Sequence, residues 1–471
     1  MNRVLVSATH KSSGKTTVAL GLCAALTARG TVVQPFKKGP DYIDPMWLGR
    51  AAGRPCLNLD AYLMDDVALE RCFAGRTADA ELALVEGNKG LYDGLALDGS
   101  NSNAALATRL GLPVLLVIDA CGMTRGIAPL ILGHQAFDRS IRIGGVILNR
   151  LGGSRHEAKL RAVIEHYTDV PVLGALHEDP RLAMIERHLG LVTCAELDDA
   201  QAKVREIGEV VGAQVDLARV RALAASAAPL ARVAPPEAPV AAPRGPTLRI
   251  GIARDRAFGF YYPDDLDALA AAGAELVPFD TLRDAALPPA LDGLIIGGGF
   301  PETCLAELEA NAALRAEIGR AIEGGLPAYA ECGGLMYLAR SITWRGRTAR
   351  MVGVIPGDAV MHERPVGRGY VHLAQTGAMP WAPGAAEGLR GHEFHHSSLE
   401  NLDPGVAFAY RVERGHGVDG RHDGIVVHRL LASYAHLRSA GTQWAPRFVD
   451  YVRRERGRLA SPARPESLAA A

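Results

Sequence analysis

Arg3-Val-Leu-Val-Ser-Ala8 and the loop after it, Thr9-His-Lys-Ser-Ser-Gly14-Lys15-Thr16-Thr17, decide the fold of the first half of the chain. The apolar run predicts a buried parallel strand, and the residues after the loop have the pattern of a helix. The loop fits the G-x-x-x-x-G-K-[ST] pattern, except that Thr9 replaces the first glycine. We therefore predict a phosphate-binding loop between a strand and a helix.

Backbone N–H groups of such a loop and of the helix N-terminus surround phosphate oxygens. We expect the loop lysine to reach the β- and γ-phosphates of ATP and the Thr16 hydroxyl to bind Mg²⁺. The candidate ATP-binding residues are Ser13, Gly14, Lys15, Thr16 and Thr17. A partitioning ATPase is an alternative for this half of the chain, although such proteins carry a second lysine where this chain has His10.

The strand-and-helix pattern repeats along the chain. Short apolar runs recur at 31–36, 82–86, 113–119, 143–149 and 172–176. Segments of helical length separate them, and this alternation predicts a doubly wound parallel sheet. The second half begins in the same way, with strands expected at 248–253 and 291–296 and a helix at 263–272. We therefore expect two α/β domains.

Residues 221–246 separate the two halves and consist almost only of Ala, Pro and other small residues. No core can be built from them, and the prolines favour an extended spacer. The predicted organisation is an ATP-binding domain at 1–220, a linker at 221–246, a second domain at 247–455 and a flexible tail at 456–471.

Composition narrows the class of protein. Lys and Arg number 51 against 52 Asp and Glu, so the net charge of -1 supplies no overall positive field that would attract nucleic acid. The longest apolar runs, such as 113–118, are too short to span a membrane. The seven cysteines form no C-x-x-C pair, which favours reduced thiols. We expect a cytoplasmic enzyme that binds neither nucleic acid nor a membrane.

Acidic residues follow the predicted strands at the edge where open α/β sheets bind ligands. Asp41 and Asp44 follow the second strand, and Glu86 and Asp93 end or follow the third. A carboxylate at this edge can complete the shell of Mg²⁺, so the predicted metal ligands are Thr16, Asp41 and Glu86. The alternative is that these residues only make local hydrogen bonds in Gly- and Pro-rich turns.

Residues 325–338 predict a strand, a sharp turn at Cys332 and a helix. Glycines allow the tight turn, and a helix N-terminus favours the thiolate, so Cys332 is a candidate nucleophile. Its candidate base is His436, for which a structural histidine at a strand end is the alternative. Backbone N–H groups could stabilise an oxyanion. The candidate oxyanion residues are Gly298, Gly299 and Gly333.

Residues 392–396, His-Glu-Phe-His-His, match the H-E-x-x-H zinc-protease pattern. That chemistry needs a helix, so that both histidines share one face. The flanking residues show no helical apolar stripe, and we predict a short strand or loop without zinc.

The chain resembles the cobyrinate a,c-diamide synthase family, which joins a dethiobiotin-synthetase-like ATP domain to a class I glutamine amidotransferase-like domain. The motifs that carry the resemblance are 14–17, 38–45, 85–87, 90–94, 297–302, 330–335, 391–395 and 432–436. The resemblance implies that Cys332 is the nucleophile and His436 its partner. The family's acidic segments fall on Asp41 and Asp44 and on Glu86 and Asp93. Together with the cations Lys38 and Lys89 near the same edge, the predicted substrate-binding residues are Lys38, Asp41, Tyr42, Asp44, Lys89 and Asp93. Lys38 and Lys89 could instead be solvated loop lysines.

The resemblance implies ATP- and glutamine-dependent amidation of acetate carboxylates on a tetrapyrrole polycarboxylate, with ATP, Mg²⁺ and L-glutamine required. Arg438 stands where ordinary class I amidotransferases carry a glutamate, so the sequence shows no third catalytic residue. Lys37-Lys38-Gly39 and Asn88-Lys89 differ from cobyrinate enzymes and resemble a subgroup thought to amidate siroheme for dissimilatory sulfite reductase. The tetrapyrrole and the formation of a homodimer stay open at this point.

Overall fold

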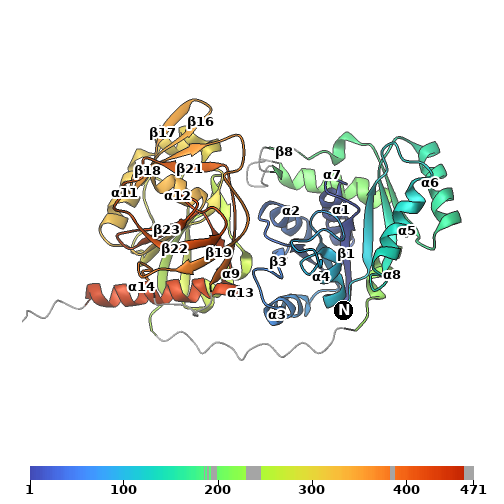
Figure 1. Ribbon diagram of the computed structural model, residues 1–471, viewed down its shortest axis with the longest axis horizontal. Coiled ribbons are helices and arrows are strands. Elements are labelled where there is room, and N and C mark those ends of the chain that lie inside the picture. The colour runs from blue at the N-terminus through green and yellow to red at the C-terminus, as the bar shows by residue number, and fades with distance from the viewer. Residues whose placement is uncertain (185, 188–189, 192–198, 230–244, 382–387, 461–471) are drawn as a thin grey trace, which may run out of the picture. The chain divides into compact units, whose positions relative to one another are not determined.

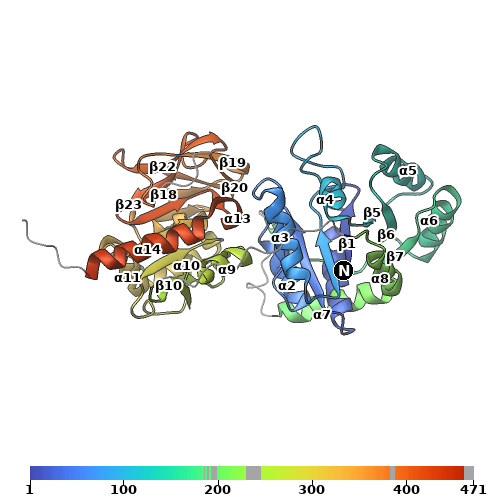
Figure 2. The ribbon, with the colours of Figure 1, turned by 90° about the horizontal axis from the view of Figure 1, so that it is seen from below.

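The computed structural model describes the chain except residues 185, 188–189, 192–198, 230–244, 382–387 and 461–471 (Figure 1). The chain divides into two compact units, Met1–Pro236 and Glu237–Ala471. Both contain strands with helices around them (Figures 1 and 2), which confirms the predicted α/β class. Of the helices in the described part of the chain, none combines the length and the apolar character that crossing a membrane requires.

Two helices extend a few residues past the boundaries predicted from the sequence. Helix α8 (Leu217–Ala225) extends into the segment predicted as a linker at 221–246, because its Leu223 and Ala224 are buried. Helix α14 (Trp444–Ala460) likewise extends into the tail predicted at 456–471. Residues 230–244 of that linker and 461–471 of that tail lie outside the described residues.

The N-terminal unit contains a seven-stranded sheet in the order β3-β2-β4-β1-β5-β6-β7. All neighbouring strands in it are parallel. Its strands are β1 (Asn2–Ala8), β2 (Val33–Lys38), β3 (Leu57–Leu59), β4 (Leu82–Glu86), β5 (Val114–Asp119), β6 (Ile143–Leu151) and β7 (Val172–His177). A separate pair consists of β8 (Glu186–Arg187) and β9 (Gly190–Leu191).

Helices connect and cover these strands. They are α1 (Lys15–Thr27), α2 (Ile43–Ala52), α3 (Asp66–Thr77), α4 (Asn103–Leu110), α5 (Ile127–Phe137), α6 (Ser154–Tyr167), α7 (Ala200–Gln214) and α8, with the short 3₁₀ helix η1 (Pro180–Leu182). Alternate strand residues, such as Val4 and Val6, pack with α1, α2, α7 and α8 in one buried cluster. Because side chains alternate along a strand, this cluster covers one face of the sheet. Glu86 and Lys38 end their strands at the carboxyl edge, which positions the first candidate site.

The C-terminal unit contains a ten-stranded mixed sheet in the order β12-β10-β13-β15-β24-β23-β22-β19-β20-β25. Pairing is parallel from β12 to β24 and antiparallel beyond. These strands are β10 (Leu248–Ala253), β12 (Ala274–Phe279), β13 (Gly293–Ile296), β15 (Ala328–Glu331), β19 (Gly367–Gln375), β20 (Leu389–His395), β22 (Ala407–Arg414), β23 (His422–Val427), β24 (Leu430–Ser433) and β25 (His436–Leu437).

Smaller elements complete this unit. The further strands are β11 (Phe258–Phe260) and β14 (Gly298–Gly299), which pair with each other, and β16 (Ala339–Trp344), β17 (Arg347–Arg350), β18 (Ile355–Met361) and β21 (Ser397–Glu400), which form a four-stranded sheet. The helices are α9 (Pro263–Ala271), η2 (Pro301–Cys304), α10 (Leu305–Ala310), α11 (Ala312–Glu323), α12 (Gly333–Leu338), α13 (Ser439–Thr442) and α14. Because β15 and β24 are parallel neighbours, the residues that follow them, Cys332 and His436, lie at the same edge of the large sheet.

Candidate active sites

The phosphate-binding loop lies between β1 and α1, as the sequence predicts. Gly14 has a φ of 84°, in the left-handed region, and a Cβ there would lie 2.0 Å from the Asn149 amide nitrogen. That amide nitrogen donates to the Ser13 carbonyl oxygen at 2.9 Å. The Ser13 hydroxyl donates to the His10 carbonyl oxygen at 2.9 Å. The loop is therefore fixed by Asn149 of β6 and by its own hydrogen bond between Ser13 and His10. It also requires glycine at position 14.

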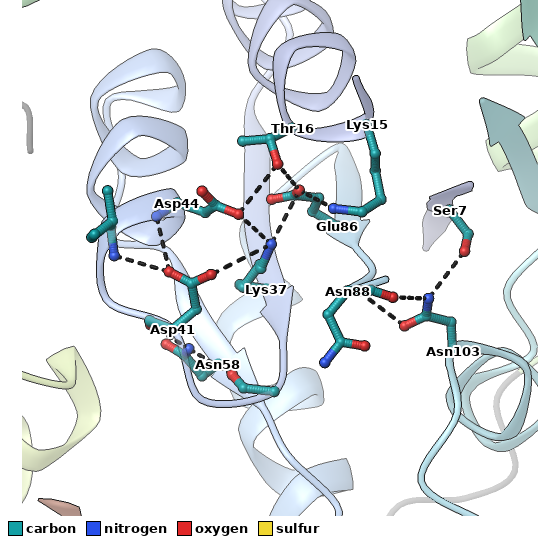
Figure 3. Close-up of polar contacts among 12 residues, drawn as sticks. Ser7, Lys15, Thr16, Lys37, Asp41, Asp44, Asn58, Glu86, Asn88 and Asn103 are labelled. Atoms are coloured by element: carbon teal, nitrogen blue, oxygen red, sulfur yellow. Dashed lines mark hydrogen bonds and ion pairs between the residues drawn. The ribbon is translucent and has the colours of Figure 1, made fainter. Parts of the chain in front are cut away.

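Charged and polar side chains converge on one oxygen of Glu86 beside this loop (Figure 3). Oε1 of Glu86 accepts from Lys15 Nζ at 2.5 Å and from Thr16 Oγ1 at 2.6 Å. Thr16 Oγ1 also lies 3.2 Å from Asp44 Oδ2. The structure therefore brings the predicted Lys15, Thr16 and Glu86 together, and it adds Asp44 to them.

Lys37 is a member of this cluster that the sequence analysis did not select. Its Nζ lies 3.1 Å from Glu86 Oε1 and also donates to the Asp44 carboxylate. Burial lowers the pKa of Lys37, but the charges of Asp44 and Glu86 outweigh burial and raise it well above its usual value. Lys37 precedes Lys38 in β2, and side chains alternate between the faces of a sheet. The paired lysines were visible in the sequence, but which of them faces the loop was not.

Asp41 and Asp44 have different roles in the structure. Oδ1 of Asp41 accepts from the backbone N–H groups of Ile43 and Asp44 at 2.9 and 3.1 Å, at the start of α2. Burial and the nearby Asp44 raise the pKa of Asp41 to about 7. Burial also raises the pKa of Asp44, but the charges of Lys37 and Lys15 lower it overall. Asp44, rather than the predicted metal ligand Asp41, therefore contacts Thr16.

The residues beside Thr16 fit a Mg²⁺ ion that arrives with ATP. Glu86 is fully buried, and its Oε2 has no hydrogen-bond partner among the described residues. Within the described ranges, no group of three or more His, Cys, Asp or Glu side chains is arranged to hold a metal by itself. Mg²⁺ in nucleotide sites commonly takes one or two carboxylates and completes its shell with phosphate oxygens and water. Glu86 and Thr16 offer that partial set of ligands.

Lys38 lies in a different environment from Lys37. Its Nζ donates to the backbone oxygen and to Oδ1 of Asn101 at 2.6 and 2.8 Å. It lines a cavity of about 580 Å³, together with Asn101 and Arg109 among others. Burial lowers the pKa of Lys38 to about 8, even though Asp60 acts in the opposite direction. Lys38 is therefore a buried cation beside an open volume.

The other predicted substrate-binding residues are spread around this edge. Lys89 is exposed, with a φ of 45°, and Tyr42 is buried before α2. Asn103 hydrogen-bonds both backbone groups of Asn88 and fixes the chain before Lys89 (Figure 3). Oδ2 of Asp93 accepts from the Gly90 N–H at 2.8 Å. The contact of Asp93 is therefore the local turn interaction that the sequence offered as an alternative.

The second candidate site is built on a sharp turn at Cys332. This residue has φ 46° and ψ -100° between β15 and α12, and its N–H donates to the Ser433 carbonyl at 2.7 Å. A Cβ at Gly334 would lie 2.0 Å from the Ile296 oxygen, and one at Gly333 would lie 3.0 Å from the Gly299 backbone. The strand, turn and helix that the sequence predicts are present, and the glycines are needed for close packing of backbone on backbone.

His436 is buried beside Cys332, and their side chains are hydrogen-bonded. Its Nδ1 donates to Glu331 Oε2 at 3.1 Å. Burial lowers the pKa of His436, but the hydrogen bonds and charges of Cys332 and Glu331 outweigh burial and raise it to about 10. The ring of His392 stacks on that of His436, with centroids 5.0 Å apart. A thiol and an imidazole in this arrangement can exchange a proton.

Glu331 contacts the ring of His436 and was not among the site residues predicted from the sequence. Arg438, at the position of the usual glutamate, is fully buried and pairs with Asp264 at 2.9 Å. The carboxylate at His436 comes instead from the residue before the nucleophile. Its only sign in the sequence was an acidic residue at the end of a buried strand, where a charge requires a partner.

The predicted oxyanion glycines lie close to the two reactive side chains. A Cβ at Gly298 would lie 2.6 Å from Cε1 of His436. Gly299 approaches Gly333, the residue after Cys332. Gly298 and Gly299 form β14, which pairs with β11. The structure thus brings all three glycines to the Cys332 site.

His392–His396 do not form a zinc-protease helix. His392 and His395 lie in strand β20, as the sequence predicts. The ring of His392 faces His436, while that of His395 stacks on Tyr434 with centroids 3.9 Å apart. His392 and His395 therefore contact different aromatic side chains and do not face a common site.

Each of the two units matches a known protein family. Residues 249–444 match the CobB/CobQ-like glutamine amidotransferase domain, and residues 2–185 match the AAA domain. The chain is 47% identical over 466 residues to the cobyrinate a,c-diamide synthase of Magnetococcus marinus, covering 98% of this chain and 99% of that one. It is 43% identical over 461 residues to that of Methanosarcina acetivorans, covering 92% of both chains. It is 40% identical over 440 residues to that of Dehalococcoides mccartyi, covering 92% of this chain and 94% of that one.

Proposed function

Because the chain belongs to the cobyrinate a,c-diamide synthase family, we propose that it uses ATP and glutamine to convert acetate carboxylates of cobyrinate into amides. It is a glutamine-dependent carbon–nitrogen ligase. The observation that carries this function is the pairing of Cys332 with His436 in one unit of a chain whose other unit holds a phosphate-binding loop. An ATP-binding assembly protein would have no use for the cysteine site.

The cysteine site releases ammonia from glutamine. The Cys332 thiol transfers its proton to His436, and the sulfur attacks the side-chain amide carbon of glutamine. The protonated His436 then donates to the leaving nitrogen, which departs as ammonia and leaves a thioester that water hydrolyses to glutamate. Backbone N–H groups among Gly298, Gly299 and Gly333 are the proposed donors to the oxyanion of each tetrahedral intermediate.

The other unit activates the acid. A free carboxylate is a poor electrophile, and transfer of the γ-phosphoryl group of ATP converts it into an acyl phosphate. Ammonia then attacks the acyl carbon, and phosphate leaves. Thr16 and Glu86 are the proposed Mg²⁺ ligands, and the bound ion would neutralise charge on the phosphates during transfer. Lys15 turns from Glu86 to the phosphates, and Lys37 stays to balance Asp44 and Glu86.

The acidic tetrapyrrole needs cations at this edge of the sheet. We propose Lys38 and Lys89 for that role, with Asp41, Tyr42, Asp44 and Asp93 nearby. Lys38 supports the proposal because it is buried beside a cavity of about 580 Å³ and pairs with amide groups rather than with a carboxylate. A substrate carboxylate would supply the missing negative charge.

Two alternatives from the sequence are not favoured. Siroheme amidation rested on the residues at 37–39 and 88–89, whereas the relatives that match nearly the full chain are named for cobyrinate. The same relatives disfavour a partitioning ATPase. A homodimer and a cytoplasmic location stay predictions.

The test separates the two half-reactions. Cys332→Ala should lose amidation with glutamine but retain it with high ammonium chloride, because only the source of ammonia is removed. Product is measured by chromatography with wild type as reference. If ammonium chloride fails to restore amidation in a folded Cys332→Ala protein, the division of roles is wrong.

A further inference from the structure

We propose that Glu331 is a positioning residue for the glutaminase reaction, which orients His436 and fixes its tautomer. It would thereby supply the carboxylate that ordinary class I amidotransferases carry at the position of Arg438. The inference rests on the proposed role of Cys332 and His436. It adds to that role a residue adjacent in sequence to the nucleophile itself.

The contacts of Glu331 leave its carboxylate little freedom. Oε1 accepts from the Tyr329 hydroxyl at 2.5 Å and from the Leu437 N–H at 3.1 Å. Oε2 then faces Nδ1 of His436 at 3.1 Å. Glu331 and His436 have 6% and 3% of their surface exposed. Two donors on one oxygen therefore hold the other oxygen against the histidine ring.

Arg438 does not act as the partner of His436 Nδ1, because its side chain is positively charged and pairs with Asp264. Its Nε and Nη2 both lie within hydrogen-bond distance of Asp264 Oδ2, and its guanidinium lies over the Tyr262 ring, 5.0 Å from the centroid. Tyr262 lies against His392. The Arg438 guanidinium is therefore paired with Asp264 and lies over Tyr262, while Glu331 occupies Nδ1 of His436.

The chemical consequence concerns the second ring nitrogen of His436. A carboxylate at Nδ1 requires the proton on that atom, which makes Nε2 the acceptor for the proton of the thiol. The groups that face His436 are Cys332, Glu331 and His392. The pKa of His392 lies well below its usual value because of burial, with the charges of His436 and Arg438 acting in the same direction. A neutral His392 leaves Glu331 as the anionic partner of the histidinium that forms.

The test is Glu331→Gln, because the two fixed donors determine how the new amide must lie. The glutamine oxygen takes the place of Oε1, so its NH₂ group faces Nδ1 of His436. Nδ1 must then accept, the proton moves to Nε2, and the ring cannot take the proton of Cys332. We expect kcat for glutamine hydrolysis to fall about 10²- to 10⁴-fold, with KM within about threefold of wild type. The pH midpoint for alkylation of Cys332 by iodoacetamide should rise.

The matched control is Glu455→Gln, another buried glutamate of the same unit, which pairs with Arg429 and Arg458. Its glutaminase kcat should stay within about threefold of wild type. The proposal is overturned if Glu331→Gln keeps a wild-type kcat, or if both variants lose activity equally. Ammonia-dependent amidation must remain in Glu331→Gln, since the other unit is unchanged.

Misfolding of Glu331→Gln and an inactive wild-type protein each lead to a different conclusion. Should Glu331→Gln fail to fold, Glu331→Asp decides, because its shorter side chain withdraws the carboxylate from Nδ1. A kcat loss of at least about tenfold supports the proposal, and a wild-type kcat overturns it. If the wild-type protein itself does not hydrolyse glutamine, the proposed function has failed rather than the role of Glu331.

Discussion

The Nζ atom of Lys37 lies 3.1 Å from Oε1 of Glu86, the same oxygen that accepts from Lys15 and Thr16. Both side chains are almost completely buried. Lys37 also contacts Asp44, so one ammonium group is shared between two carboxylates. In the proposed nucleotide complex, in which Lys15 turns toward the phosphates, Lys37 is the cation that stays paired with Glu86 and Asp44. The proposed Mg²⁺ ligand Glu86 is therefore paired with a lysine that is not itself a proposed ligand.

Lys37→Met should strongly destabilise the N-terminal unit, because it leaves the Asp44 carboxylate without its ammonium partner and leaves buried Glu86 with Lys15 alone. Breaking such a pair costs about 3–5 kcal/mol of the free energy of unfolding. Urea denaturation followed by circular dichroism measures this loss. Lys38→Met is the control, with an expected loss of about 1 kcal/mol, because the partners of Lys38 are amide groups. Equal losses in the two variants would refute the central position of Lys37.

Removal of divalent ions should affect the two half-reactions differently. With EDTA present, ammonia-dependent amidation should stop, because Glu86 and Thr16 then lack the ion that accompanies ATP. Glutamine hydrolysis should continue, because Cys332, His436 and Glu331 need no metal and the histidines of β20 form no zinc-protease helix. The measurements are amide formation and glutamate release in the same buffer. Loss of glutamate release with EDTA, restored by zinc, would contradict this assignment.

Lys89→Met with Asn88→Val should weaken binding of the tetrapyrrole. A charged hydrogen bond from Lys89 to a substrate carboxylate contributes roughly 1.5–3 kcal/mol. Its loss should raise KM for the tetrapyrrole about 10- to 150-fold, at about 1.4 kcal/mol per decade. Glutaminase activity should not change. Lys159→Met, at an exposed site on α6, serves as the control. An unchanged tetrapyrrole KM in the double variant removes Lys89 from the substrate site.

The stability contribution of His436 should decrease in alkaline solution. Its pKa is raised to about 10 in the folded protein, despite burial, by Cys332 and Glu331, whereas an unfolded histidine titrates near about 6.5. The folded state therefore binds this proton more tightly. The resulting stabilisation is complete below about pH 6.5 and is lost as the pH rises through about 10.

The measurement compares wild type with His436→Gln by urea denaturation at pH 6 and pH 10. General alkaline effects act on both proteins and cancel in the difference between their free energies of unfolding. That difference should become smaller at pH 10. A difference that does not change with pH would show that His436 carries no raised pKa.

Local features of the sites were predictable from the sequence because neighbouring residues determine them. The loop at Gly14 and the turn at Cys332 each require a strand, small residues and a helix in immediate succession, and this order can be read directly. The distant His436 was also found, because a histidine at the end of a predicted strand lies at the edge where such strands meet.

The choice among neighbouring residues could not be predicted. Lys37 and Lys38 differ only in the face of β2 to which they belong. Asp41 was expected at the metal, but it binds the first N–H groups of α2 and leaves Asp44 to contact Thr16. The role of Glu331 depends on the pairing of β15 with β24, which brings His436 beside it across a long stretch of sequence.

Mass spectrometry of candidate acids tests the central claim most directly. Cobyrinate, hydrogenobyrinate and siroheme are each incubated with the protein, ATP, Mg²⁺ and glutamine, and the conversions of acid to amide are counted. We predict that cobyrinate gains two amides, as in the name of the relatives, and that omission of either ATP or glutamine prevents it. Amidation of siroheme while cobyrinate and hydrogenobyrinate stay unchanged, or no amidation by a protein that still hydrolyses glutamine, would contradict the account.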